Sequence, residues 1–378
     1  MHTKISAQNT KIIGYYIGKF GELWTKSLTD LIKEGVAGAL ADSQIDPSEI
    51  DAIFVANKAG GSFNEQRHLG ALVSEQFAHF PPAMRVEGAC ASGGLAVIAA
   101  EQAIRSGLYQ TVLVLGVEKM TDVSSSETSA ILATAASRDQ EYGSTFPALY
   151  AVLANYHMQR YGTTREQLSS VVVKNHHHAM TNPAAQFHKE FTPEQVSSSV
   201  MVASPLRLLD CSPITDGVAA VILSSKPSAR KTELLGFGHA QDSLALQDRR
   251  DLSELAATKI AASRALKMAN LSQKDIQAAE VHDCFSIAEI LATEDLGFFA
   301  KGEAATQIAA GATTHGGQIL INPSGGLKAC GHPVGATGVK QVAFLSAMIE
   351  NGQIERGLTH NVGGSGATAV VTILGSKK

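Results

Sequence analysis

The spacing of apolar residues along the chain predicts alternating helices and strands, and the same order occurs twice. In the first half it predicts a helix over 27–41, and the continuous apolar run at 52–55 is typical of a buried strand. In the second half a helix over 253–268 precedes a strand over 278–281. The chain therefore carries an internal repeat of about half its length, which is too long a period for a solenoid.

A second pair of corresponding segments lies later in each half. In both, a small-residue, Gly-containing stretch opens a helix, a glycine follows the last apolar position, and an apolar strand comes next. These segments are a helix over 95–106 with a strand over 111–116, and a helix over 339–351 with a strand over 358–362. Such alternation gives parallel or mixed sheets covered by helices. We expect an α/β fold of two duplicated βαβαβ-type halves, related by a pseudo-two-fold axis.

The repeat also suggests how the chain divides into domains. Residues 121–205 are rich in Ser, Thr, Ala and His and show only weak periodicity. A long insertion of this kind in an α/β body commonly forms a ligand-binding lid, so we expect a loop domain here. The N-terminal half is then expected over 1–120 plus 206–228, and the C-terminal half over 229–378.

Composition narrows the classes of partner. The chain has 378 residues, and its 31 basic and 35 acidic side chains give a formal charge of −4, which argues against a nucleic-acid partner. The apolar run at 111–117 is too short to span a bilayer, and residues 1–24 lack an apolar signal segment. Four widely separated cysteines fit a reducing compartment. We expect a cytoplasmic protein with no membrane partner.

Cys90 is the first candidate for chemistry. It lies between an extended segment at 84–86 and a helix whose first turn is Ala-Ser-Gly-Gly. The unpaired N–H groups at a helix N-terminus lower the pKa of a thiol, which predicts a reactive thiolate. The alternative is a small buried hydrophobic residue, as many free cysteines are.

His332 is the second candidate. Glycine lies close to it on both sides in the segment 325–338, which permits close approach of backbones, and Pro333 stiffens the loop before the next helix. The duplication gives this loop the same place in the second half that Cys90 has in the first. We therefore expect the two side chains to meet, with the imidazole acting as base for the thiol.

Two further groups of candidates follow strands of the second half. Loops at the carboxyl ends of strands are where open α/β sheets place their sites, and glycine-rich loops let backbone N–H groups reach a carbonyl oxygen. The segment 282–285 has an alternative, since Cys284 also fits a core position and Asp283 a helix cap. The candidates are His282, Cys284, His360, Asn361, Gly363 and Gly364.

Taken together, these motifs resemble the ordered motif set of the thiolase superfamily. They are Cys-Ala-Ser-Gly from residue 90, His-Asp-Cys-Phe at 282–285, Gly-His-Pro-x-Gly-Ala-Thr-Gly at 331–338 and the late glycine loop. The resemblance covers residues 10–375 and is closest to the sterol-carrier-protein-type and archaeal-like acetyl-CoA acetyltransferase branch. It implies the thiolase fold, an αβαβα layered arrangement with an inserted loop domain, and at least a dimer.

The resemblance also implies roles for the candidate residues. Ordinary thiolases carry Asn-Glu-Ala-Phe where this chain has 282–285, and a second cysteine where it has His360. Cys284 is then expected to replace the missing cysteine as acid and base near the substrate α-carbon. His282 is expected to take the place of the asparagine at the oxyanion site, together with His332.

The expected activity is Claisen condensation and thiolysis of acyl-CoA, namely two acetyl-CoA to acetoacetyl-CoA plus CoA. Coenzyme A thioesters are the substrates, and the scheme requires no metal or other cofactor. A longer-chain 3-ketoacyl-CoA thiolase or another Claisen-type acyltransferase is the alternative enzyme, and a weakly active scaffold subunit of an acyl-CoA multi-enzyme complex is the alternative of another class. By resemblance, we expect a homodimer or homotetramer, with a small zinc-ribbon and OB-fold protein and a downstream condensing synthase as partners.

Overall fold

The computed structural model describes residues 10–376, so the ends of the expected halves at 1–9 and 377–378 lie outside the described residues. Each half contributes five strands to the main sheet. The first half supplies β1 (Lys11–Ile17), β2 (Ala52–Ala56), β3 (Ala83–Val86), β4 (Thr111–Glu118) and β7 (Gly217–Ser224). The second supplies β8 (Glu233–Gln241), β9 (Ala278–Glu280), β10 (Leu320–Ile321), β11 (Arg356–Gly363) and β12 (Thr368–Gly375).

The strand order repeats, as the internal repeat of the sequence predicts. The first half runs β3-β2-β4-β7-β1 and the second runs β10-β9-β11-β12-β8. In each half the first three strands pair in parallel and the remaining pairs are antiparallel. The two sets join through one β1–β8 pairing, Lys11 with Glu233, into a single ten-stranded sheet.

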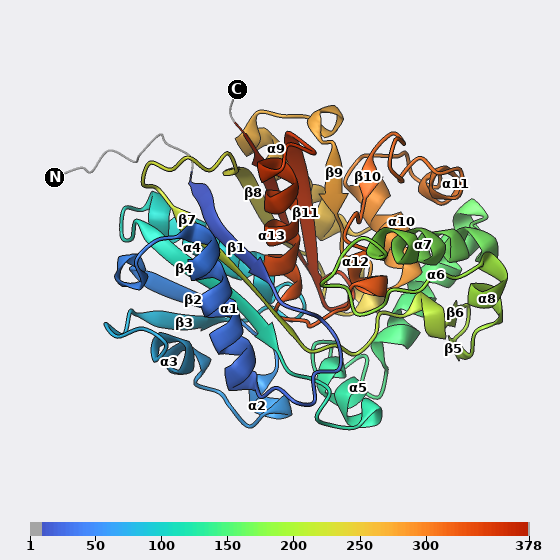
Figure 1. Cartoon of the computed structure of the whole chain (residues 1–378). Coiled ribbons are helices and arrows are strands. Elements are labelled where there is room, and N and C mark those ends of the chain that lie inside the picture. Colours follow the sequence, from blue (N-terminus) through green and yellow to red (C-terminus); the bar gives the residue numbers. More distant parts are fainter. Residues whose placement is uncertain (1–9, 377–378) are drawn as a thin grey trace.

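Helices cover both faces of each set of strands, and one pair lies between the sets (Figure 1). The helix α1 (Leu28–Ser43) packs on the outer face of β1 and β7, and α9 (Ala256–Ala269) packs on β8 and β12. The central pair is α4 (Ser92–Arg105) and α13 (Thr337–Glu350), which contact strands of both halves. These layers are those of the expected αβαβα arrangement.

The buried strands explain why the sequence shows continuous apolar runs. Along β4, Val112 and Val114 face the core around α4 and α13, whereas Leu113 and Leu115 face the core under α1. Successive side chains of a strand point to opposite faces, so a strand covered on both sides is apolar at every position.

Both central helices begin earlier than predicted, because their glycines belong to the first turn. A Cβ atom on Gly93 would lie 2.7 Å from the backbone nitrogen of Gly338, and one on Gly338 would collide with the backbone of Gly94. Glycine is therefore required where the two helix N-termini cross. This crossing brings the loops that precede α4 and α13 to one place.

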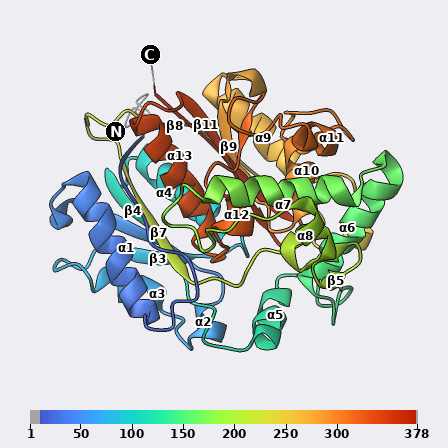
Figure 2. The same ribbon diagram turned by 45° about the vertical axis from the view of Figure 1, so that its right-hand side comes forward.

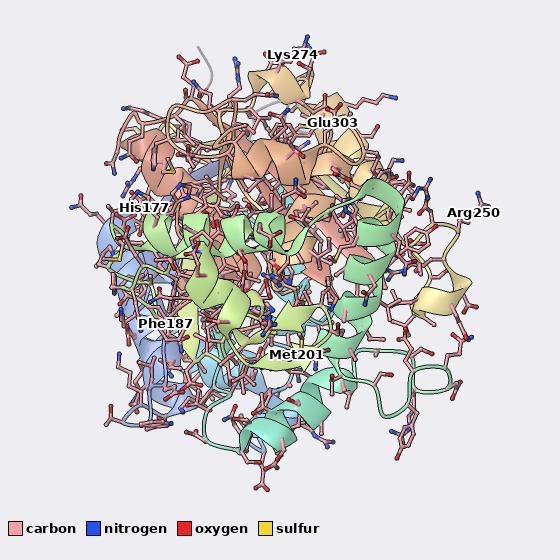
Figure 3. The ribbon with its side chains drawn as sticks, turned by 90° about the vertical axis from the view of Figure 1, so that its right-hand side faces the viewer. His177, Phe187, Met201, Arg250, Lys274 and Glu303 are labelled. Atoms are coloured by element: carbon pink, nitrogen blue, oxygen red, sulfur yellow. The ribbon has the colours of Figure 1, made fainter. Side chains whose placement is uncertain are left out.

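The segment between β4 and β7 is not irregular but largely helical. Its elements are α5 (Ser125–Ala133), α6 (Phe146–Tyr161), α7 (Arg165–Ala179), α8 (Pro193–Ser198), β5 (Met201–Ala203) and β6 (Leu206–Arg207). The helix α7 crosses the short helix α12 (Gly326–Ala329) and also packs on α10 (Ser286–Asp295) and α11 (Ala304–Ala309) (Figure 2). The remaining α-helices of residues 10–376 are the short α2 (Gly60–Phe63) and α3 (Leu69–Ser74). Between residues 10 and 376, no helix is long and apolar enough to cross a membrane.

A buried carboxylate joins the two halves beside the crossing of α4 and α13. Glu118, at the end of β4, is fully buried and accepts a 3.0 Å hydrogen bond from the Asn57 side chain. It also accepts hydrogen bonds at 2.9 Å from the backbone N–H groups of Lys58, Ala59 and Gly335. Because Gly335 belongs to the second half, one charged group holds both halves in register.

We expect Glu118→Gln to destabilise the protein, because an amide replaces a carboxylate that satisfies four donors. The cost in unfolding free energy should be about 3 kcal/mol. The matched control is Glu254→Gln, which breaks a partly exposed ion pair with Lys259 (2.9 Å) and should cost less than about 1 kcal/mol. Urea unfolding of both variants makes the comparison, and equal midpoints would contradict this assignment.

Candidate active site

The predicted candidates meet at a pocket between the two halves and the helical segment. The cavity has a volume of about 140 Å³, and apolar side chains such as Met120, Leu132 and Phe146 form much of its wall. Five of the candidate residues line it: Cys90, His282, Cys284, His332 and Gly364. Five of the eight predicted site residues thus line one pocket, although they lie far apart in the chain.

Cys90, His282 and His332 form the centre of the pocket. The Cys90 sulfur and one ring nitrogen of each histidine all lie within 4.8 Å of one another. The two imidazole rings meet edge to face, with centroids 4.9 Å apart and planes at 85°. The Cys90 thiol is partly exposed to the pocket, while His282 and His332 are 2% and 7% exposed. Sulfur and imidazole are thus close enough to exchange a proton directly or through one water molecule.

Cys90 precedes the helix α4, whose first residue is Ser92 and whose N-cap is Ala91. We expected the helix N-terminus to lower the pKa of the thiol, and this expectation is wrong. Burial raises its pKa to about 11, and only part of this rise is offset by the nearby Lys58 ammonium and by backbone N–H groups of Gly364 and Cys90. The loss of solvent in the largely apolar pocket therefore outweighs the effect of the helix N-terminus on the thiol pKa.

The hydrogen bonds of His332 define which of its nitrogens is free. The Thr337 hydroxyl donates its only hydrogen to the Pro333 carbonyl at 3.1 Å, so it accepts from His332 Nδ1–H at 2.7 Å. This leaves Nε2 without a proton. The Thr215 hydroxyl accepts from the backbone N–H of His332 at 3.0 Å and anchors the loop.

Burial, reinforced by the Lys340 ammonium, lowers the pKa of His332 to about 3. Its imidazole is therefore neutral at pH 7, when the Cys90 thiol is protonated. The resting site thus holds an uncharged thiol and an uncharged base, and not an ion pair.

Asn361 defines the tautomer of His282, which is the opposite of the His332 tautomer. The Asn361 side-chain oxygen accepts a 3.0 Å hydrogen bond from the Gly94 N–H, and its amide nitrogen donates to the Cys90 carbonyl at 2.9 Å. These two contacts fix the orientation of the amide. The same nitrogen lies 3.3 Å from His282 Nδ1, which must accept, so the ring proton is on Nε2. His282 therefore offers a hydrogen-bond donor, whereas His332 offers an acceptor.

Cys284 lies on the same pocket, and burial strongly raises the pKa of its thiol. The Tyr150 hydroxyl contacts this sulfur and also donates to the Gly364 carbonyl at 3.3 Å. Tyr150 is buried and its ring packs against Phe285 with centroids 4.6 Å apart. It can turn its proton toward the sulfur whenever Cys284 becomes a thiolate. The spacing of motifs does not predict this contact, because Tyr150 belongs to the segment between the halves.

The remaining candidates lie behind the pocket wall. His360 accepts a 3.5 Å hydrogen bond from the backbone N–H of His282, and its other ring nitrogen contacts the Thr258 hydroxyl at 2.9 Å. A Cβ atom on Gly363 would lie 2.6 Å from the Gly88 carbonyl oxygen, so this glycine permits a close crossing of backbones. His360, Asn361 and Gly363 therefore support the residues that line the pocket.

Comparison with families of known proteins gives two matches. The thiolase N-terminal domain family matches residues 5–227, and the thiolase C-terminal domain-like family matches residues 238–376. The chain belongs to the thiolase family.

Individual proteins also match this chain over nearly its whole length. An acetyl-CoA acetyltransferase of Methanothermobacter thermautotrophicus is 47% identical over 97% of this chain and 99% of its own. Sterol carrier protein 2 of Gallus gallus is 33% identical over 95% of this chain and 70% of its own. The solved structure of the Ltp2–ChsH2(DUF35) aldolase is 22% identical, covers 99% of both chains and has a TM-score of 0.83.

The predicted thiolase superfamily, its fold and an acyltransferase class of enzyme are confirmed by these matches. The roles of the individual pocket residues stay predictions.

Because only a thiolate reacts with iodoacetamide, alkylation of Cys90 should rise about tenfold per pH unit and reach half of its plateau rate only near pH 11. Lys58→Met removes the cation that lowers the thiol pKa, so alkylation at pH 9 should slow further. The rate of Cys90 modification is followed by mass spectrometry in a Cys211→Ser background, which removes another partly exposed thiol. A plateau below pH 9 would be inconsistent with the neutral thiol.

Proposed function

We propose that the protein interconverts acetoacetyl-CoA plus CoA with two molecules of acetyl-CoA, using Cys90 as the nucleophile. The observation that carries the proposal is the grouping of a thiol, an unprotonated imidazole nitrogen and an imidazole N–H donor in one pocket. Acyl transfer through a thioester needs these three functions. The 47% identical acetyl-CoA acetyltransferase supports the choice of substrate.

In the direction of cleavage, Cys90 first attacks the ketone carbonyl of acetoacetyl-CoA. Its proton passes to His332 Nε2, which is free to accept it because Nδ1–H is held by Thr337. The negative charge that develops on the ketone oxygen needs donors in place before the reaction, and the protonated His332 and the His282 Nε2–H supply them. The carbon–carbon bond then breaks, leaving acetyl-Cys90 and the enolate of acetyl-CoA.

Cys284 completes the first half of the reaction. Its raised pKa keeps the thiol protonated in the resting site, so it can give its proton to the α-carbon of the enolate. The resulting thiolate is stabilised by the Tyr150 hydroxyl and takes the proton of the incoming CoA thiol. CoA attacks the acetyl-Cys90 carbonyl, acetyl-CoA leaves, and Cys90 recovers its proton from His332. Protons and atoms balance, and condensation follows the same steps in reverse.

The small, largely apolar pocket favours short acyl chains. Its volume is about 140 Å³, and apolar side chains such as Met120, Leu132 and Phe146 form much of its wall. Rates of thiolysis measured across acyl lengths should therefore be highest for acetoacetyl-CoA. The same proposal includes a cytoplasmic location, a homodimer or homotetramer, a small zinc-ribbon and OB-fold partner and a downstream condensing synthase. Co-purification of the native protein tests the oligomer and the partners.

Two variants separate the half-reactions. Cys90→Ala should lose the acyl-enzyme altogether and reduce thiolysis by roughly 10³-fold or more. Cys284→Ala should still become acetylated by acetyl-CoA, because the nucleophile and its base remain, but should lose condensation to a similar extent. Mass spectrometry of the Cys90 peptide and a steady-state assay give both results. Wild-type turnover in Cys90→Ala would reject the proposed function.

Asn361→Asp tests the donor role of His282. A carboxylate accepts from Nδ1–H, so the ring proton should move from Nε2 to Nδ1 and the oxyanion should lose a donor. We expect kcat to fall roughly 10²–10³-fold with a much smaller change in KM. The tautomer is read directly from the ¹⁵N chemical shifts of the labelled imidazole. An unchanged tautomer in the variant would refute the assignment to Asn361.

A further inference from the structure

The three central residues of the site also form a set of potential metal ligands, and the proposed acyl transfer does not use them in that role. Thiolate and imidazole are the side chains that zinc prefers, and the sulfur of Cys90 and a nitrogen each of His282 and His332 lie within 4.8 Å of one another. We propose that these three residues bind one Zn²⁺ ion reversibly, and that the ion inhibits the enzyme by occupying the nucleophile and its base.

The geometry is close to that of a three-ligand zinc site. Zn–S and Zn–N bonds of about 2.3 and 2.0 Å place tetrahedral ligand atoms roughly 3.5 Å apart, so the three groups need to approach by about 1 Å. Both histidines lie edge to face, so their ring edges converge without stacking. The pocket side of the cluster leaves the fourth position to water or to a substrate oxygen.

His332 is already arranged as a metal ligand. A histidine that binds zinc donates its second ring N–H to a neighbouring acceptor, which orients the ring. His332 Nδ1–H makes this contact with the Thr337 hydroxyl at 2.7 Å, and its Nε2 has a free lone pair. Its loop is also held by the backbone hydrogen bond to Thr215.

His282 explains why the ion is an inhibitor rather than a permanent constituent. To bind zinc through Nε2, its ring must carry the proton on Nδ1, where the Asn361 amide now donates at 3.3 Å. The same ring therefore serves as a donor in the empty pocket or as a ligand when zinc is bound, and Asn361 favours the donor.

The binding step balances without any redox partner. The S–H bond of Cys90 breaks, the Zn–S bond forms, and one proton leaves to the buffer. The His282 proton moves from one ring nitrogen to the other through solvent, with no net release.

The test measures binding directly, so that it does not depend on turnover. Enzyme freed of metal is titrated with Zn²⁺ against a chromogenic chelator, and separately with Co²⁺, whose thiolate complexes show a charge-transfer band in the near ultraviolet. We expect one ion per chain, a sulfur-to-cobalt band, and loss of that band on adding Zn²⁺.

Variants of the cluster should change the zinc affinity in opposite directions. His282→Asn removes a ligand, so it should lower the zinc affinity by more than the roughly 10–100-fold that is typical when a partner outside the ligand set is lost. Asn361→Asp should raise the zinc affinity about tenfold, because the carboxylate favours the ring proton on His282 Nδ1. Cys90→Ser should lose the cobalt band, and the matched control Cys211→Ser, at a cysteine of the same pocket outside the cluster, should bind as the wild type does.

Three results would overturn the site: no binding at micromolar zinc, an unchanged affinity in both Cys90→Ser and His282→Asn, or a cobalt complex without thiolate. A further arm rests on the proposed function: enzyme acetylated at Cys90 by acetyl-CoA should not bind zinc. If acetylation fails while the free enzyme still binds one ion, the proposed function is wrong and the zinc site stands.

Discussion

The crossing of α4 and α13 at Gly93 and Gly338 is the contact on which the rest of the site depends. Any side chain at either glycine would meet the backbone of the opposite helix, so the two N-termini approach as closely as the chain permits. The loops that precede these helices carry Cys90 and His332. Asn361 lies at the same crossing and contacts the Cys90 loop, the first turn of α4 and His282. Packing of small residues thus determines where the reacting groups lie.

Much of this arrangement could be predicted from the sequence, because the sequence contains an internal repeat. Periodicity and glycine predicted the helices α1, α4, α9 and α13, the strands β2, β4, β9 and β11, and the corresponding loops that carry Cys90 and His332. The pairing that joins β1 to β8 could not be predicted, because a single pair of residues leaves no pattern in the chain. The helical content of the segment between β4 and β7 was also missed, because its helices bury residues against several neighbours and show no clear apolar face.

The chemistry of the site was harder to predict than its location. A motif places Cys90 near a helix end, but the pKa of its thiol depends on how many apolar atoms surround it, and the folded chain alone determines that. The tautomers of His282 and His332 depend on Asn361, Thr337 and Pro333, and only the first of these was a candidate. Hydrogen-bond direction is a property of contacts between distant residues, and spacing along the chain does not encode it.

The loops that carry Cys90 and His332 bear on how such a site can arise. The helices that follow them are equivalent, because the N-caps Ala91 and Ala336 match and Gly93 crosses Gly338. Cys90 directly precedes its N-cap, whereas His332 lies four residues before its own, so Gly335 takes the place of the thiol in the second copy. A site that takes sulfur from one loop and nitrogen from the other therefore requires the two copies to differ, and the shared Glu118 carboxylate holds them together.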